Sequence, residues 1–157
     1  MGRRIREELK QSRPFASLEE EVVVEIQRTA QNVMRWLVEE LKPIGLTPSQ
    51  YNVLRILRGS SPEPLSATEI CSRMVTYDPD LTRLMDRLEA AGLVRKQRGT
   101  RDRRVVDVHI TPLGRETVER AITAARARIA AELAGMGKAR LEQLADLLER
   151  VRGNDNE

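Results

Sequence analysis

The segment LVRKQRGTRDRRVVDVHI, at positions 93–110, decides the fold of this chain of 157 residues. Its first residues, Leu and Val, are typical of a strand. In its second half Val106, Val108 and Ile110 alternate with polar residues, which is the period of a half-buried strand. Gly and Thr at 99–100 lie between the two halves, where a turn is expected. The segment therefore predicts a β-hairpin with a basic tip.

Positive charge is concentrated in this hairpin. Residues 95–104 hold six basic residues and one acidic residue, whereas the whole chain has 27 basic and 24 acidic residues. The hairpin thus carries +5 of a net charge of only +3, and the rest of the chain sums to −2. A concentrated positive surface attracts polyanions, with double-stranded DNA as the first candidate. The alternative is an ordinary solvated loop.

Two short helices are predicted immediately before the hairpin. Ser66, followed by Glu69, has the spacing of a capping box that starts the first helix. Its expected apolar contacts are Ile70, Cys71, Met74 and Val75. Asp78-Pro79 is expected to start the second helix, which ends before Gly92. The inner face of that helix consists of Leu81, Leu84, Met85 and Leu88. This arrangement predicts a helix-turn-helix, whose second helix fits the major groove of DNA while the hairpin offers arginine to the adjacent narrow groove.

Longer helices are predicted on both sides of this module. One begins at Ser17 and ends before Pro43, one spans Thr47 to Gly59, and another begins at Thr111. A last helix follows two glycines at 135–137. Apolar stripes at helical spacing are formed by Val22, Ile26, Val33, Leu37 and Leu41, by Val118, Ile122, Ala125, Ile129 and Leu133, and by Leu141, Leu144, Leu148 and Val151. These stripes exceed what one small module needs to cover.

The expected fold is therefore mainly α with a small β-hairpin wing, a winged helix-turn-helix joined to a helical dimerisation region. The expected segments are a basic N-terminal arm (1–16), a first dimerisation helix (17–45), the DNA-binding lobe (46–112), C-terminal dimerisation helices (113–152) and a polar tail (153–157). A two-fold homodimer would hold two recognition helices about 34–36 Å apart, one DNA turn. The alternative is that the long helices simply wrap the monomer.

Composition argues against several other classes of protein. No run approaches the roughly 20 apolar residues that cross a bilayer, and the first residues lack a secretion signal, so no membrane partner is expected. One cysteine excludes an internal disulfide, and a cytoplasmic location is expected. No phosphate loop, nucleophile motif or metal-ligand spacing is present, which predicts a protein that is not an enzyme, with no metal site and no cofactor.

Three segments resemble signature blocks of the MarR family of winged helix-turn-helix regulators. They are LKPIGLTPSQYNVLRIL, DLTRLMDRLEAAGLVRK and TRDRRVVDVHITPLG, and the resemblance runs from Ser17 to Val151. The pattern DRR-x4-HIT-x2-G is the most specific part. The resemblance implies a homodimeric transcriptional regulator, usually a repressor of a pseudo-palindromic operator. Such regulators often release DNA when a small lipophilic or phenolic effector binds.

The resemblance also implies roles for residues of the hairpin. Arg104 matches the arginine that enters the minor groove, and Asp102 matches the acid that holds its guanidinium through charge-assisted hydrogen bonds. Arg101 and Arg103 are expected to meet phosphates. If instead these residues are solvated loop charges, none of them will be special for binding.

Further DNA contacts are expected from the helix-turn-helix. Thr82 and Arg83 match the polar pair that faces the major groove, and Arg87 lies beside them. Arg83 either pairs with guanine or rests on a phosphate. Ser66 and Thr68, at a helix N-terminus, offer further phosphate contacts, and Ser66 is in any case a helix cap.

Asp80 departs from the family pattern, in which a small hydroxyl residue is usual. Its carboxylate either accepts a hydrogen bond from cytosine N4 or is a helix-start charge favoured by the macrodipole. The first alternative predicts that Asp80→Ala relaxes sequence preference at one position of each half-site.

Two further hypotheses remain open. Met34, Trp36 and Tyr51 are candidate ligand-binding residues or ordinary core residues. Cys71 is either a core residue or, with a lowered pKa and exposure, a redox sensor. The alternative functions are therefore a redox-responsive regulator that uses Cys71, or a helical interaction module without specific DNA binding.

Overall fold

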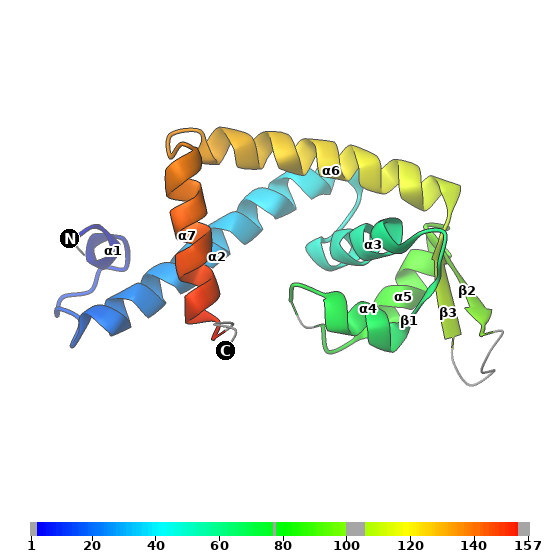
Figure 1. Cartoon of the computed structure of the whole chain (residues 1–157), viewed down its shortest axis with the longest axis horizontal. Coiled ribbons are helices and arrows are strands. Elements are labelled where there is room, and N and C mark those ends of the chain that lie inside the picture. The colour runs from blue at the N-terminus through cyan, green and yellow to red at the C-terminus, as the bar shows by residue number, and fades with distance from the viewer. Residues whose placement is uncertain (1–2, 77, 100–105, 154–157) are drawn as a thin grey trace.

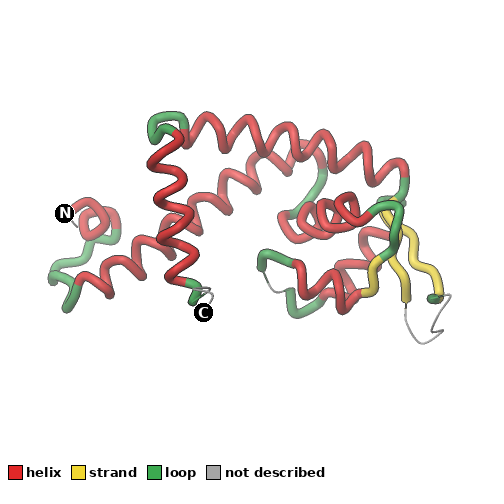
Figure 2. Tube along the Cα trace, in the orientation of Figure 1, coloured by secondary structure: helices red, strands yellow, loops and turns green. Residues whose placement is uncertain are grey.

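The computed structural model of the chain describes residues 3–76, 78–99 and 106–153. Its elements are α1 (Arg3–Glu8), α2 (Leu18–Leu41), the 3-10 turn η1 (Lys42–Ile44), α3 (Pro48–Ser60), β1 (Leu65–Ser66), α4 (Ala67–Arg73), α5 (Leu81–Ala90), β2 (Val94–Arg98), β3 (Val106–Ile110), α6 (Pro112–Leu133) and α7 (Lys138–Val151). Helices dominate and the strands form one small sheet (Figure 2), as the sequence predicts.

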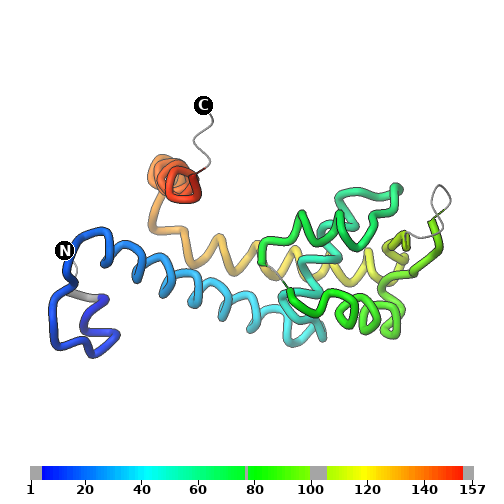
Figure 3. The backbone as a smooth tube through the Cα atoms, turned by 90° about the horizontal axis from the view of Figure 1, so that it is seen from below, coloured from blue at the N-terminus to red at the C-terminus, as the bar shows by residue number. Residues whose placement is uncertain are grey.

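The elements form a lobe and an extended helical arm (Figure 1). Helices α3, α4 and α5 and the sheet make up the lobe, while α2 and α6 run side by side away from it. Helix α7 overlaps α2 in Figure 1, but Figure 3 shows it standing apart from the α2–α6 pair. The sheet and α7 therefore lie at opposite ends of the molecule.

The sheet has three antiparallel strands in the order β1-β3-β2. In the hairpin, Val94 pairs with Ile110 and Arg98 pairs with Val106. The short strand β1 pairs with the other side of β3. This order leaves β2 as an edge strand whose outward N–H and C=O groups need partners outside the sheet.

The buried core lies in the lobe and where α2 and α6 join it. Leu41 of α2, Leu54 of α3, Leu88 of α5 and Val118 of α6 are all fully buried. In α2 only Leu41 is buried, and α7 has no buried residue. Much of the surface of α2 and of α7 is thus exposed in the described part of the chain.

The predicted helix starts are mostly confirmed. Thr47 and Ser66 form complete capping boxes, in which the hydroxyl of each accepts the N–H of the third helical residue at 3.2 Å. At α2 the box is incomplete: Ser17 accepts from the Glu20 N–H, but the Glu20 carboxylate accepts from the Ala16 N–H instead of from Ser17.

Three local expectations are wrong. Helix α5 begins at Leu81, and its N-cap is Asp80. The Asp78 carboxylate accepts the Asp80 N–H at 3.0 Å, which makes a turn where the sequence suggested the first helical residues. Helix α3 continues through Gly59 to Ser60. Val75, expected in the core, is 84% exposed.

The segment before α2 is more than a polar arm. It contains the helix α1, whose Ile5 is 2% exposed. Glu8 at its end lies 3.7 Å from Arg28 on α2. The N-terminal segment therefore contains a buried apolar residue and forms an ion pair with α2.

Candidate nucleic-acid interface

Helix α5 separates its polar and apolar residues onto two faces. Leu84, Met85 and Leu88 are buried in the core. The exposed side carries Thr82, Arg83 and Arg87, which are expected to face DNA, together with Asp86. Gly92 has φ +69°, a conformation that favours glycine, and it turns the chain from α5 into the hairpin. The fold thus delivers a polar helix face and a hairpin in immediate succession.

Asp80 lies next to Arg83 at the start of this face. Its Oδ2 is 3.4 Å from Arg83 Nη1, and both side chains are largely exposed. Asp80 makes no capping hydrogen bond through its side chain. The carboxylate is therefore placed to orient the Arg83 guanidinium, and its contact with a base remains a hypothesis.

The N-terminus of α4 places Ser66 and Thr68 differently. The Ser66 hydroxyl and N–H are engaged with Glu69, as expected for a cap. The Ser66 N–H and then its hydroxyl hold the pKa of the Glu69 carboxyl below its usual range. Thr68 is exposed on the first turn. Phosphate contacts by either residue remain predictions.

A compact junction fixes the base of the hairpin to α6. The Leu93 carbonyl accepts the Thr111 N–H at 3.1 Å, and the Thr111 hydroxyl lies 2.7 Å from the Gly92 carbonyl oxygen. The same hydroxyl accepts the Gly114 N–H at 2.9 Å, which caps α6. The sequence predicted Thr111 as a helix start, and Gly114 entered only as the last residue of the family pattern. In the structure these two residues join the hairpin to the arm.

The residues between the two strands that are expected to act at DNA lie outside the described residues. They are Arg101, Asp102, Arg103 and Arg104. Strand β2 ends at Arg98 and β3 begins at Val106, so these four residues belong to the connection at the tip. Their roles in the minor groove and at phosphates stay predictions.

Of the three candidate ligand residues, Tyr51 lines a pocket between α3 and α6. The pocket measures about 220 Å³ and is lined by Tyr51, Arg55, Arg58, Ile122, Ala125, Arg126 and Ile129. The Arg55 guanidinium lies 5.5 Å from the centre of the Tyr51 ring. Met34 is exposed and Trp36 half-buried on α2, and neither contributes to this lining.

The arginines of this pocket were missed by the sequence reasoning. Tyr51, Arg55 and Arg58 follow one another at helical spacing on α3, which was the available signal. Arg58 pairs with Glu119 of α6, so it also connects the lobe to the arm. The sequence does not show which helix covers this face of α3, and that packing is what makes the pocket.

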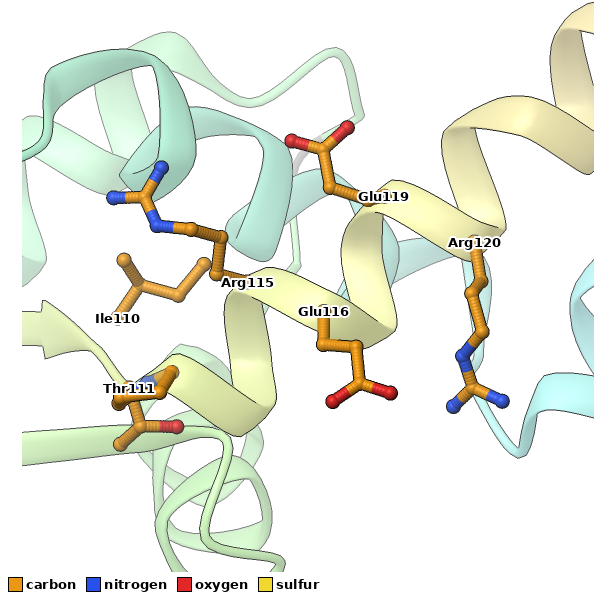
Figure 4. Close-up of a pocket in the computed structure, with 7 residues that line it drawn as sticks. Ile110, Thr111, Arg115, Glu116, Glu119 and Arg120 are labelled. Atoms are coloured by element: carbon orange, nitrogen blue, oxygen red, sulfur yellow. The ribbon is translucent and has the colours of Figure 1, made fainter.

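A second, more open hollow lies at the start of α6 (Figure 4). Arg115 turns toward α3 and donates to the Ser61 hydroxyl at 2.5 Å, whereas Glu116 and Arg120 point away from it. The charged groups diverge, and they do not surround a common point. This hollow therefore has no converging polar groups of the kind that hold a small ligand.

No described helix combines the length and the apolar character that a bilayer-spanning segment requires. Among the residues placed in the structure, no group of three or more His, Cys, Asp or Glu side chains could hold a metal ion.

A short helix pair with an exposed polar recognition helix, followed by an antiparallel hairpin, defines a winged helix-turn-helix protein, a class that binds DNA. Residues 44–105 match the model of the MarR family. The chain is 27% identical over 131 residues to the HTH-type transcriptional repressor MdtR of Bacillus subtilis (strain 168), covering 83% of each protein.

Solved structures of the same architecture agree with this assignment. A MarR family transcriptional regulator from Silicibacter pomeroyi is similar with a TM-score of 0.70 and 25% identity, over 92% of this chain and 97% of that one. BpsR of Bordetella bronchiseptica, whose DNA binding is regulated by 6-hydroxynicotinic acid, has a TM-score of 0.78 and 23% identity, over 92% and 100% of the two chains. These similarities support a MarR-type, DNA-binding transcriptional regulator rather than an enzyme.

Proposed function

We propose that the protein acts in the cytoplasm as a homodimeric repressor of a pseudo-palindromic operator, and that a small lipophilic or phenolic effector relieves repression. The observation that carries the proposal is the exposed apolar surface of the arm. Repression is supported by the similarity to the repressor MdtR.

The arm supports dimerisation because its apolar side chains are uncovered in the single chain. On α2, Leu18 is 68% exposed, and on α7, Val151 is 63% exposed. Further exposed apolar residues of α2, α6 and α7 are Val22, Val23, Val33, Val38, Ile129, Leu144 and Leu147. Exposed apolar residues in such number are typical of a protein interface. A second copy of the chain would bury it and align two recognition helices.

We expect Leu144→Glu to convert the dimer into a monomer, because it places a charge in the apolar face of α7. Operator affinity should then fall by about 100-fold, since the two half-sites no longer act together. The matched control is Gln143→Glu, which adds the same charge at the neighbouring exposed position. Light scattering after gel filtration gives the mass, and fluorescence anisotropy gives the affinity. A Leu144→Glu protein that remains dimeric would rule out this interface.

The pocket at Tyr51 supports the effector proposal. It offers the aromatic ring and apolar side chains together with three guanidinium groups, which favour an effector that carries an acidic group. BpsR responds to an aromatic acid of this type. Because the pocket lies between a lobe helix and an arm helix, a ligand that fits only one spacing of the two would favour that spacing.

We expect 6-hydroxynicotinate to weaken operator binding and its methyl ester to do so much less. Arg126→Met should raise the apparent dissociation constant of the acid about tenfold, the usual loss for a hydrogen bond to a charged group. Arg140→Met, on the exposed side of α7, is the matched control. Calorimetry and anisotropy competition provide the measurements. Equal responses to acid and ester, or to the two variants, would contradict an anion-binding pocket.

The redox alternative is tested in the same assay. Cys71 is half-buried on α4. DNA binding that is insensitive to peroxide would exclude Cys71 as a sensor. The DNA binding of the family weighs against the remaining alternative, a helical interaction module.

A further inference from the structure

We propose that Lys96 is a positioning residue that holds the hairpin on the recognition helix, and that it supports DNA binding without contacting DNA. The two carboxylates that hold it are Asp86 and Glu89 of α5, and we call the three residues the wing clamp. The inference rests on the DNA binding of this fold and names the element that fixes its geometry.

The wing clamp joins β2 to α5 through both side-chain and backbone groups. Lys96 Nζ lies 2.5 Å from Asp86 Oδ1 and 3.0 Å from Glu89 Oε2. The Lys96 N–H donates to Glu89 Oε1 at 2.9 Å. Glu89 therefore accepts from the backbone and from the side chain of the same residue, which fixes the strand in both position and orientation.

The position of Lys96 in the sheet explains the backbone contact. Because β2 is the edge strand, N–H groups that point away from β3 have no partner in the sheet. The Lys96 N–H is one of them, and Glu89 satisfies it. Asp86 and Glu89 are three residues apart on α5, so their side chains lie on the same face of the helix and converge on one ammonium group.

The Lys96 side chain is only 27% exposed, which distinguishes it from the other basic residues of β2. Its two carboxylate partners, Asp86 first, raise the pKa of Lys96. The Lys96 N–H, followed by its ammonium group, lowers the pKa of Glu89. One of the six basic charges of the hairpin region is thus already neutralised within the protein and is not free for phosphate.

For Glu89→Gln, the wing clamp and the net charge predict opposite changes in DNA affinity. The wing clamp has two negative charges and one positive charge beside a DNA-binding face. If only net charge mattered, Glu89→Gln would tighten DNA binding, because it removes a negative charge near the phosphates. If the wing clamp positions the hairpin, the same substitution weakens binding, because the hairpin is no longer held at a fixed distance from α5.

The test measures binding to the DNA fragment selected by the wild-type protein, over a series of salt concentrations. We expect Lys96→Met and Glu89→Gln each to weaken binding about tenfold, and the double variant to be no weaker than either single variant, as for a coupled pair. The slope of log affinity against log salt should stay at the wild-type value, because no phosphate contact is lost. Lys96→Arg should retain most of the affinity.

Arg95→Met is the matched control, since it removes the same charge from the neighbouring, exposed position of β2. Thermal unfolding of each variant separates misfolding from misplacement, and Glu89→Gln keeps an oxygen for the Lys96 N–H if Lys96→Met fails to fold. Tighter binding by Glu89→Gln overturns the proposal. We expect Arg95→Met to reduce the slope of log affinity against log salt. An equal reduction for Lys96→Met would also overturn the proposal. Failure of the wild-type chain to bind DNA would instead overturn the proposed function.

Discussion

Gly114→Ala is expected to cost about 4 kcal/mol or more of the free energy of unfolding, among the largest effects of a single substitution. A Cβ atom at Gly114 would lie 2.0 Å from the Leu93 carbonyl oxygen and 2.9 Å from its carbon. Both are backbone atoms, so the clash cannot be relieved by rotating a side chain. The carbonyl that would be displaced accepts the Thr111 N–H at the junction of hairpin and arm.

Gly59→Ala is the matched control for this substitution. Gly59 lies within α3, and a Cβ there would meet no atom within 4 Å. Alanine should therefore stabilise the helix slightly, by about 0.5 kcal/mol. Urea unfolding at one fixed protein concentration compares the two variants, because the stability of a dimer depends on concentration. If Gly114→Ala lowered the free energy of unfolding by no more than an ordinary surface substitution does, the close approach of Gly114 to Leu93 would be refuted.

The sequence predicts those parts of the fold that depend on neighbours a few residues away. The capping residues Thr47, Ser66 and Thr111 each act on an N–H group three residues later, so their pattern is visible in the chain. The alternation in the second strand predicts burial correctly only at Val108, because Ile110 is half-buried like its polar neighbours and Val106 is 45% exposed at the end of β3. Local rules therefore sufficed for the helix-turn-helix and its hairpin.

Other features depend on contacts between distant residues, whose partners the sequence does not reveal. Lys96 contributed to the positive charge of the hairpin, but its partners lie seven and ten residues back, on the preceding helix. Ile5 lies in a segment interpreted from the sequence as a basic, polar arm, because charged and polar residues outnumber its few apolar ones. The pocket at Tyr51 needs α6 to pack on α3, which is a long-range event. In each case the residue types were visible and the partner was not.

These observations change the meaning of the basic segment. We infer two separate uses for its charge: Lys96 holds the hairpin at its base, and the arginines near the tip are expected to contact DNA. The junction at Thr111 and Gly114 fixes the same hairpin from the side of the arm. We expect a movement of α6 to reach the base of the hairpin through these hydrogen bonds. The proposed effector, bound between α3 and α6, would then have a short physical route to the DNA-binding surface.

Arg104→Ala is expected to weaken operator binding by about 30-fold, and Arg103→Ala by only a few-fold. The resemblance to the family matches Arg104 to the arginine of the minor groove, where a narrow groove concentrates negative potential. Loss of a charged hydrogen-bonding group there costs more than loss of a phosphate contact at the rim. Because Asp102 is expected to hold the Arg104 guanidinium, Asp102→Asn should also weaken binding, although it removes a negative charge.

The two arginines are separated by their dependence on salt and on sequence. For Arg103→Ala we expect the slope of log affinity against log salt to fall by about 0.9, the value for one lost phosphate contact, with an equal loss on operator and on unrelated DNA. For Arg104→Ala the loss should be larger on the operator than on unrelated DNA, because groove shape contributes to sequence preference. Anisotropy titrations on both fragments give these quantities. Equal losses of affinity for the two variants on both DNA fragments would show that the hairpin binds DNA only through non-specific electrostatic attraction.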